Sequence, residues 1–259
     1  IGRVGHTALV NTYFGKFYTS GKAEYKMDIP SLFPITLKSY FILNKLDYFR
    51  NFATFFAPQR PSYLVSNEVF VGLDLKHAIN NTITGELTNR YFLLEDRYFQ
   101  DNNFANGDTT DQTKFQGYSL SYEIEQNTLN RKQFASAGHY FGIKVRYVNG
   151  VEKSVAGNTS QIPFDAVKTH NWITFSADFQ TFPVTTKNFS LGFQGKFVVN
   201  SQSLFSNYTA SMLAMTAFTP IPDMGTYFMK EYRSPQYIGF GTNLVVTFLK
   251  NFEWRADLF

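Results

Sequence analysis

The sequence predicts an all-β protein, a transmembrane antiparallel β-barrel of which about eleven strands lie in this chain. Three observations predict this fold. Apolar and polar residues alternate along segment after segment, most of these segments last about ten residues or more, and short turns alternate with long polar loops. Strands of soluble proteins commonly have about five or six residues, whereas a strand that crosses a bilayer needs about nine to eleven.

The alternation is clearest in residues 171–180. Ile173, Phe175 and Phe179 fall on one face of an extended chain, and Ser176 falls on the other. A helix would spread these residues around its circumference, so the pattern indicates a strand. Comparable runs occur, in chain order, near 3–14, 16–28, 35–48, 69–75, 80–93, 118–125, 141–147, 189–197, 238–248 and 252–258.

The connections between these runs are short and long in turn. Outer-membrane barrels have short turns on the periplasmic side and long loops that face outward. Only the link near Gly15 breaks this order, because it is short where a long loop is expected. The tight turns lie at Asp28–Pro34, Lys76–Asn81, Asn127–Gly138, Pro183–Lys187 and Lys250–Asn251, and the long loops at 50–62, 94–112, 149–168 and 201–235.

Composition narrows the range of functions. Aromatic residues make up 18% of the chain, with 29 Phe and 16 Tyr, and barrels place such residues on the lipid face and in interfacial girdles. The absence of cysteine excludes disulfide scaffolds, zinc–thiolate sites and thiol catalysis. The net charge of +4 comes with no Lys/Arg stripe or RNA-binding motif, so we expect no nucleic acid partner. No stretch approaches the roughly 18 consecutive apolar residues of a transmembrane helix.

The polar faces of the predicted strands carry charges of both signs. Such rows are untenable against hydrocarbon, so we expect them to face the lumen. Two interpretations remain open, a salt-bridged and largely plugged interior or a selective pore, and the mixed signs favour the plug. A soluble β-sandwich or lipocalin-like barrel is a further alternative, but eleven long strands exceed what such small barrels use. The charged residues are Lys22, Glu24, Lys26, Glu123, Glu125, Lys144, Arg146, Asp178, Lys196, Arg255 and Asp257.

Residues 122–138 have the sequence YEIEQNTLNRKQFASAG. This segment resembles the periplasmic turn of the bacterial surface-antigen family, which includes the BamA-type assembly barrels and the two-partner secretion transporters. In that turn a strand is followed by Asn/Asp-Arg/Asn, a few residues, Pro-x-x-Gly and another strand. Asn130, Arg131 and Gly138 match the turn, while Ala135 stands at the position of the family's proline.

The same resemblance makes residues 201–235 the counterpart of the family's sixth extracellular loop, which folds back into the lumen. The family's Arg-Gly-Phe/Tyr motif in that loop corresponds to a stretch with Arg233, Gln236 and Tyr237, which lacks the glycine and the spacing. In the family, that arginine pairs with carboxylates inside the barrel, and an exposed loop arginine is the alternative for Arg233. The carboxylates that the resemblance implies as partners are Asp178 and Glu123.

Four short runs resemble a second family more closely. They are NTLNRKQFAS at 127–136, RYVNG at 146–150, LFSNYTA at 204–210 and PIP at 220–222. All four are similar to the barrels of bacterial patatin-like phospholipases, especially those of Bacteroidetes, and this resemblance covers essentially the whole chain. It implies that residues 1–259 form a single partial barrel domain, strands three to thirteen of the family's sixteen, in the bacterial outer membrane. It also implies that the barrel anchors or translocates an attached patatin-like phospholipase domain.

The chain carries no catalytic signature, so we expect no enzymatic activity from it alone. A patatin-type lipase needs a Gly-x-Ser-x-Gly turn, and the nearest match, at 117–121, lacks the second glycine and lies in an alternating strand. Ser119 is therefore expected to be a structural residue that faces the lumen. The four histidines are scattered, so we interpret them as girdle or loop residues and expect no metal and no cofactor.

Four functions remain open at this point. They are the lipase-bearing membrane anchor, which we prefer, a BamA-type assembly or secretion barrel, a porin-like channel, and a soluble ligand-binding β-protein. The chain opens at Ile1 without Met or a signal peptide and stops in mid-pattern at Phe259, so we expect it to be an excerpt of a longer protein. Its expected partners are outer-membrane lipid and an attached lipase or POTRA domain.

Overall fold

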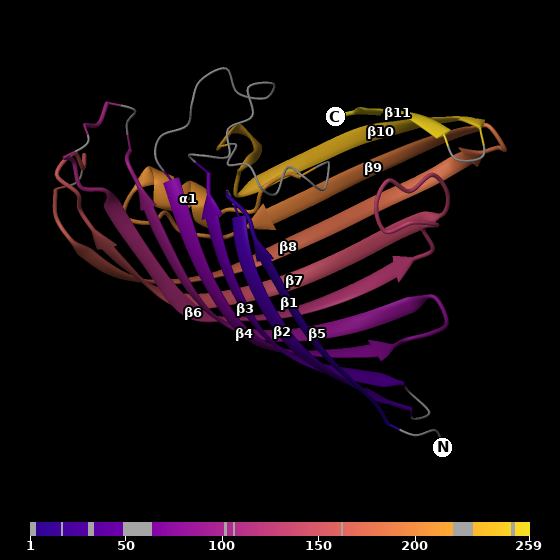
Figure 1. Cartoon of the computed structure of the whole chain (residues 1–259), viewed down its shortest axis with the longest axis horizontal. Helices are drawn as coiled ribbons and strands as arrows, with labels where there is room; N and C mark the ends of the chain where they lie inside the picture. Colours follow the sequence, from indigo (N-terminus) through magenta and orange to yellow (C-terminus); the bar gives the residue numbers. More distant parts are fainter. Residues whose placement is uncertain are drawn as a thin grey trace.

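The strands of this protein, seen in a computed structural model, form an antiparallel sheet. Each of its eleven strands pairs with the next one along the chain, so that β1 and β11 are the two edges. The sheet is curved, and the short helix α1 (Tyr208–Ala214) lies over its concave face (Figure 1). The structure describes residues 4–16, 18–30, 34–48, 64–100, 103–105, 107–161, 163–219, 230–249 and 252–259.

The connections alternate between a short-turn end and a long-loop end of the sheet, as the sequence predicts (Figure 1). The link after β1 is short, as expected, and the Gly15 N–H donates to the Tyr18 carbonyl at 2.9 Å. None of the helices in the described part of the chain is long and apolar enough to cross a membrane. The strands are β1 (Gly5–Phe14), β2 (Tyr18–Ile29), β3 (Ile35–Asp47), β4 (Leu64–Ala78), β5 (Ile83–Tyr98), β6 (Asp111–Asn127), β7 (His139–Val155), β8 (Ala166–Thr185), β9 (Phe189–Asn200), β10 (Gln236–Leu249) and β11 (Phe252–Leu258), and a 3-10 helix, η2, spans Lys230–Tyr232.

The apolar residues of the alternating pattern lie on the convex face and are exposed. Ile173 and Phe175 of β8 are 54% and 37% exposed, whereas Ser119, on the concave face of β6, is 4% exposed. Ser119 is therefore a buried residue of the concave face, as expected. A soluble antiparallel sheet buries its apolar face and exposes its polar face, so this sheet has the opposite arrangement.

The pairing register aligns the outward apolar residues of neighbouring strands into a continuous convex belt. Val145 of β7 lies opposite Phe175 of β8, for example. Four residues further along β7, Asn149 lies opposite Asn171, and from here on polar residues interrupt the belt. Contiguous exposed apolar surface of this extent marks contact with a membrane or a partner.

Polar groups border the convex belt at both ends of the sheet. At the long-loop end, Glu95, Lys114 and Lys153 are successive partners across β5, β6 and β7, and the Glu95 carboxylate lies 3.5 Å from Lys114 Nζ. At the short-turn end, His77 stacks on Tyr122 with ring centroids 6.0 Å apart. An apolar band between polar and aromatic borders is typical of strands that cross a bilayer.

Strands β5 to β8 extend further than the sequence analysis indicated. The expected loops 94–112 and 149–168 are reduced to 99–110 and 156–165. The predicted boundaries are wrong because polar outward residues, Asn149 and Lys153, alternate there with Val151 and Val155, so the contrast between the two faces weakens while the strand continues.

An aromatic core fills the space between the concave face and α1 at the long-loop end. Phe115 of β6 stacks with Trp172 of β8 at a centroid distance of 5.5 Å, and Phe205 meets Phe115 edge-on at 5.1 Å. Such aromatic pairs contribute about 0.5–1.5 kcal/mol beyond their buried area. The buried cluster consists of Tyr48, Leu64, Phe92, Tyr98, Phe115, Val148, Trp172, Phe205 and Ala210.

The assignment of faces predicts unequal effects of a new charge at two neighbouring positions. Phe175→Asp puts a carboxylate into the convex belt, while Ser176→Asp puts one on the concave face. A Lys or Arg on the lipid face at mid-bilayer costs about 2–4 kcal/mol, and an Asp somewhat less. We therefore expect Phe175→Asp to lower the folded fraction in lipid vesicles far more than Ser176→Asp, measured by heat-modifiable gel mobility. Equal effects of the two substitutions would contradict the assignment.

Candidate functional site

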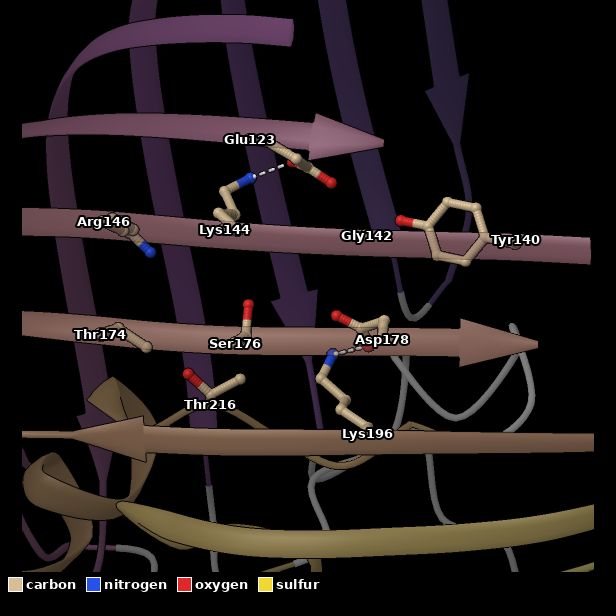
Figure 2. A pocket seen from close by; sticks show the side chains of 10 residues that line it. All are labelled: Glu123, Tyr140, Gly142, Lys144, Arg146, Thr174, Ser176, Asp178, Lys196 and Thr216. Atoms are coloured by element: carbon tan, nitrogen blue, oxygen red, sulfur yellow. Dashed lines mark hydrogen bonds and ion pairs between the residues drawn. The ribbon is translucent and has the colours of Figure 1, made fainter. Parts of the chain in front are cut away.

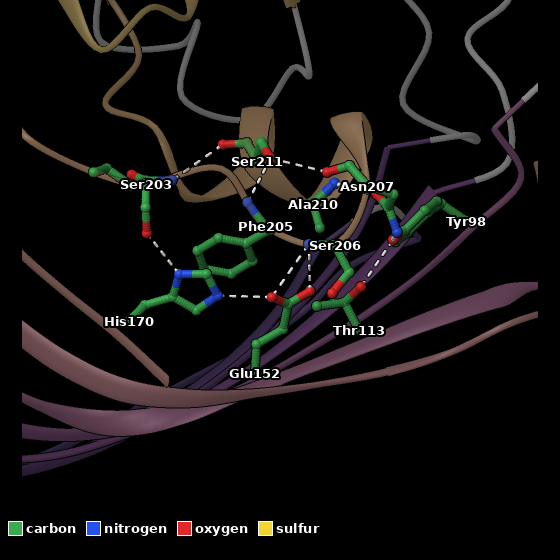
Figure 3. A network of polar contacts seen from close by, with 11 residues as sticks. Tyr98, Thr113, Glu152, His170, Ser203, Phe205, Ser206, Asn207, Ala210 and Ser211 are labelled. Atoms are coloured by element: carbon green, nitrogen blue, oxygen red, sulfur yellow. Dashed lines mark hydrogen bonds and ion pairs between the residues drawn. The ribbon is translucent and has the colours of Figure 1, made fainter. Parts of the chain in front are cut away.

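A buried hydrogen-bonded pair fastens the segment after β9 to the long-loop end of the sheet. His170 Nε2 of β8 lies 2.7 Å from Glu152 Oε2 of β7, and the two side chains are 3% and 0% exposed. His170 Nδ1 lies 2.9 Å from Ser203 Oγ, and the Ser206 N–H donates to Glu152 Oε1 at 2.9 Å (Figure 3). We call these four residues the loop anchor. A carboxylate is tolerated in such a buried place only when partners surround it, and here it has two.

The same segment leads into α1, and Asn207 ties the start of this helix to the sheet. The side-chain oxygen of Asn207 accepts a hydrogen bond from the Ala210 N–H at 2.8 Å, which makes Asn207 the N-cap. Its amide nitrogen donates to the Tyr98 hydroxyl, which lies 2.8 Å from Thr113 Oγ1 (Figure 3). Asn207 therefore caps the N-terminus of α1 and also links this helix to β5 and β6.

The far end of α1 is held by Arg233, in the segment that returns to β10. Arg233 Nη1 donates to the carbonyls of Met212, Leu213 and Met215 at 3.3, 2.9 and 3.2 Å. A cation at the C-terminus of a helix satisfies its last carbonyls and interacts favourably with the helix dipole. Burial lowers the pKa of the Arg233 guanidinium, and the neighbouring Tyr48 opposes this shift. Arg233 is thus a residue that folds the segment rather than an exposed loop arginine.

The carboxylates expected to pair with Arg233 have other partners. Glu123 binds Lys144 at 2.9 Å, and Asp178 binds Lys196 at 3.3 Å. The structure therefore does not bring Arg233 to the residues that the family resemblance implies. The carboxylates that act on Arg233 belong to Asp96 and Glu68.

The other two residues of the expected motif, Gln236 and Tyr237, stand at the start of β10. The Tyr237 hydroxyl donates to the Ala217 carbonyl at 3.1 Å, so Tyr237 holds the same returning segment as Arg233. The Gln236 carbonyl accepts a hydrogen bond from Ser234 Oγ at 2.9 Å. Sequence analysis therefore identified residues that shape the segment over the concave face, with different contacts from those expected.

The loop anchor contains the residue types of an acyl-transfer triad, a serine, a histidine and a carboxylate. The serine approaches His170 at Nδ1, whereas the serine of such a triad binds Nε2. Acyl transfer also needs N–H groups that are free to stabilise an oxyanion. The N–H groups of Phe205 and Ser206 donate instead to Ser211 Oγ and to Glu152. We therefore interpret the loop anchor as structural.

A cavity of about 400 Å³ lies in the middle of the concave face (Figure 2). The Lys144–Glu123 and Lys196–Asp178 pairs described above border this central cavity. No group of three or more His, Asp or Glu side chains that suits a metal ion occurs in the part of the chain that the structure describes. Further pairs of opposite charge on the concave face are Lys22–Glu24, Lys26–Asp28, Lys38–Asp74, Lys76–Glu125 and Arg255–Asp257.

The turn between β6 and β7 is built by residues of the expected family turn. Asn130 Oδ1 accepts hydrogen bonds from the N–H groups of Ser136 and Ala137 at 3.0 and 3.2 Å. Gly138 has a φ of +91°, a conformation that side chains disfavour. A Cβ at this position would lie 2.2 Å from the Thr128 carbonyl oxygen, so no other residue fits without a shift of the backbone.

This turn also reaches β11, across β8, β9 and β10. Arg131 Nη1 and Nη2 donate to the two oxygens of Glu253, both at 2.6 Å, and these bonds raise the pKa of Arg131. Arg255 Nη1 donates to the Ala135 carbonyl at 2.7 Å, and its guanidinium lies over the Phe134 ring. We call these five residues the turn tie. Bidentate Arg–carboxylate pairs are among the stronger hydrogen-bonded contacts in proteins.

The comparisons with known proteins concern the fold alone. No protein-family model and no curated protein matches the chain. Among solved structures, the chain is similar to BauA, the ferric preacinetobactin receptor from Acinetobacter baumannii, at 10% identity and a TM-score of 0.42 over 98% of this chain and 42% of the receptor. It is also similar to the siderophore receptor PiuA from Acinetobacter baumannii, at 11% identity and a TM-score of 0.35 over 96% of this chain and 43% of that one. The chain spans less than half of the length of either receptor.

Sequence analysis missed the loop anchor and the turn tie. The interpretation of His170 as a girdle or loop residue is wrong, because this side chain is buried against Glu152. Both residues keep the two-residue period of the concave faces of β7 and β8, so an alternation followed beyond the convex belt would have found them. No sequence signal connects Arg131 with Glu253, because 122 residues separate them.

We expect Glu152→Ala to destabilise the segment that covers the concave face. The substitution removes the acceptor of His170 and of the Ser206 N–H, and breaking a buried pair in this way costs about 3–5 kcal/mol. Urea unfolding in detergent, followed by tryptophan fluorescence, measures the loss. Glu95→Ala is the matched control, since Glu95 pairs with exposed Arg97 and Lys114, and such pairs contribute about 0–1 kcal/mol. Similar losses in the two variants would argue against the loop anchor.

We expect Gly138→Ala to destabilise the protein by more than about 1 kcal/mol, because it combines a positive φ with a backbone clash. Gly107→Ala is the control, since a Cβ at Gly107 meets nothing within 4 Å. The midpoint of thermal unfolding compares the two variants. A Gly138→Ala protein as stable as the Gly107→Ala protein would show that the turn adapts.

Proposed function

We propose that this chain belongs to a membrane-spanning β-barrel of the bacterial outer membrane. The observation that carries the proposal is the convex belt, in which aromatic and aliphatic side chains are exposed and aligned in register. Water disfavours so large an apolar surface, whereas lipid accommodates it, and closed β-barrels are the sheets that satisfy their backbone in lipid. Stable solubility of the folded protein without detergent would overturn this assignment.

The concave face supports a plugged barrel rather than an open pore. Most of its charges are neutralised in pairs of opposite sign, whereas selective pores use rings of one sign. The loop anchor, Asn207 and Arg233 together hold α1 over this face. At the short-turn end of the sheet, the turn tie holds the β6–β7 turn against β11.

The resemblance stated in the sequence analysis supports a proposal about what the barrel carries. We propose that the barrel anchors or translocates a patatin-like phospholipase domain, because the runs at 127–136 and 146–150 are similar to barrels of that kind. A BamA-type assembly or secretion barrel is the alternative. The sequence encoded upstream of Ile1 discriminates between them, because a Gly-x-Ser-x-Gly turn would support the lipase and POTRA repeats would support assembly.

We expect the purified protein to form no steady, large channels in planar lipid bilayers, because α1 lies over the concave face and most charges there are paired. Current recordings at fixed voltage test this expectation. Glu152→Ala releases the loop anchor and should increase the frequency of brief openings, whereas Glu95→Ala should not. Steady, large conductance of the unmodified protein would contradict the plugged arrangement and favour the porin-like alternative.

A further inference from the structure

Arg146 places a positive charge in the central cavity without a negative partner. It lies on the concave face of β7 and lines the cavity (Figure 2). Within the residues that the structure describes, its guanidinium takes part in no hydrogen bond and no ion pair. The ionisable groups that act on it are Arg90 and Tyr40. Arg90 donates to the Tyr40 hydroxyl at 2.8 Å, so it adds a second positive charge and supplies no counter-ion.

The charges around the central cavity leave an excess of one positive charge. Three cations line the cavity, Lys144, Arg146 and Lys196, against two carboxylates, Glu123 and Asp178. Each lysine is already neutralised by one of the carboxylates. The excess therefore belongs to Arg146. A partly buried charge without a partner is unfavourable, so such a side chain indicates an anion that comes from outside the chain.

Four residues that line the cavity carry hydroxyl groups, and two of these hydroxyls lie on elements other than β7 and make no hydrogen bond within the described residues. These two belong to Ser176 of β8 and to Thr216, which follows α1 (Figure 2). Neither hydroxyl makes a hydrogen bond with any residue in the described ranges, whereas the neighbouring Thr174 donates to Asn200 at 3.2 Å. Because Thr216 lies in the segment that covers the concave face, a ligand here would contact both the sheet and that segment.

We propose that the central cavity binds a phosphate group, as free phosphate or as a phosphate monoester, with Arg146 as its principal ligand. The planar fork of a guanidinium binds two phosphate oxygens at once. A tetrahedral anion presents its remaining oxygens in other directions, where Ser176 and Thr216 supply hydroxyl donors from a second strand and from the covering segment. The proposal depends neither on the membrane assignment nor on an attached domain.

Isothermal titration calorimetry of the purified protein with sodium phosphate, at constant ionic strength in chloride buffer, tests the proposal. We expect saturable binding, and Arg146→Gln should weaken it about tenfold or more, which corresponds to about 1.4 kcal/mol. Arg146→Lys keeps the positive charge but lacks the planar guanidinium, so its affinity for phosphate should lie between those of the unmodified protein and Arg146→Gln. The matched control is Lys22→Gln, which removes a concave-face cation already paired with Glu24 at 2.6 Å and should leave binding unchanged.

Two further variants keep the test decisive if Arg146→Gln fails to fold. Ser176→Ala and Thr216→Val preserve the charges and should each weaken binding about three- to tenfold, as expected for the loss of one hydrogen bond. Tighter binding of glycerol 3-phosphate than of phosphate would identify a monoester such as a lipid headgroup, and equal binding would identify free phosphate. The proposal is overturned if the unmodified protein shows no saturable binding at tens of millimolar phosphate. It is also overturned if folded Arg146→Gln, or both hydroxyl variants, bind as tightly as the unmodified protein.

Discussion

Backbone pairing in a fixed register is the constraint on which the rest of this structure depends. Side chains alternate along each strand, so a slip of one residue would exchange the two faces of that strand. The register that sets Val145 opposite Phe175 builds the convex belt. The same register sets Lys144 opposite Glu123 on the concave face, where the two side chains bind each other. A single set of backbone hydrogen bonds therefore determines both the apolar exterior and the pairing of charges on the concave face.

The segment over the concave face is ordered by its anchors rather than by its own helix. An isolated helix needs about 12–15 residues for even marginal stability in water, and α1 has seven. Asn207 fixes its start against Tyr98, and Arg233 collects the carbonyls at its end. Glu152 of β7 accepts a hydrogen bond from the Ser206 N–H, just before α1. Because Glu152 is completely buried, water cannot compete for its hydrogen bonds. The rigidity of this segment is thus a property of the sheet that it contacts.

The sequence was sufficient for the strands and their faces, because hydrophobic alternation reports directly on burial. It was insufficient where that contrast ends. From Asn149 onward, polar and apolar side chains mix on the outward face of β7, so the pattern is weak and the sequence places Glu152 in a loop. Contacts between distant segments carry no local signal in the sequence. The sequence therefore identifies Arg131 as a turn residue but does not reveal that it binds Glu253. Which charges on the concave face are paired can be known only from the strand register. Lys144 lies opposite Glu123 and binds it, whereas Arg146 lies opposite Ser121 and Thr174 and has no carboxylate partner.

The turn tie has a consequence for the order in which the chain assembles. Arg131 lies in the turn between β6 and β7, but its partner Glu253 is 122 residues later in the chain and belongs to the last strand of the sheet. Contacts of such sequence separation form late, after the loop between them has been closed. The contact between Arg131 and Glu253 can therefore form only once β11 has joined the sheet, and until then water hydrates the exposed Arg131 guanidinium. Once formed, this contact joins the turn to the last strand across β8, β9 and β10, and so restrains how far the sheet can flatten between them.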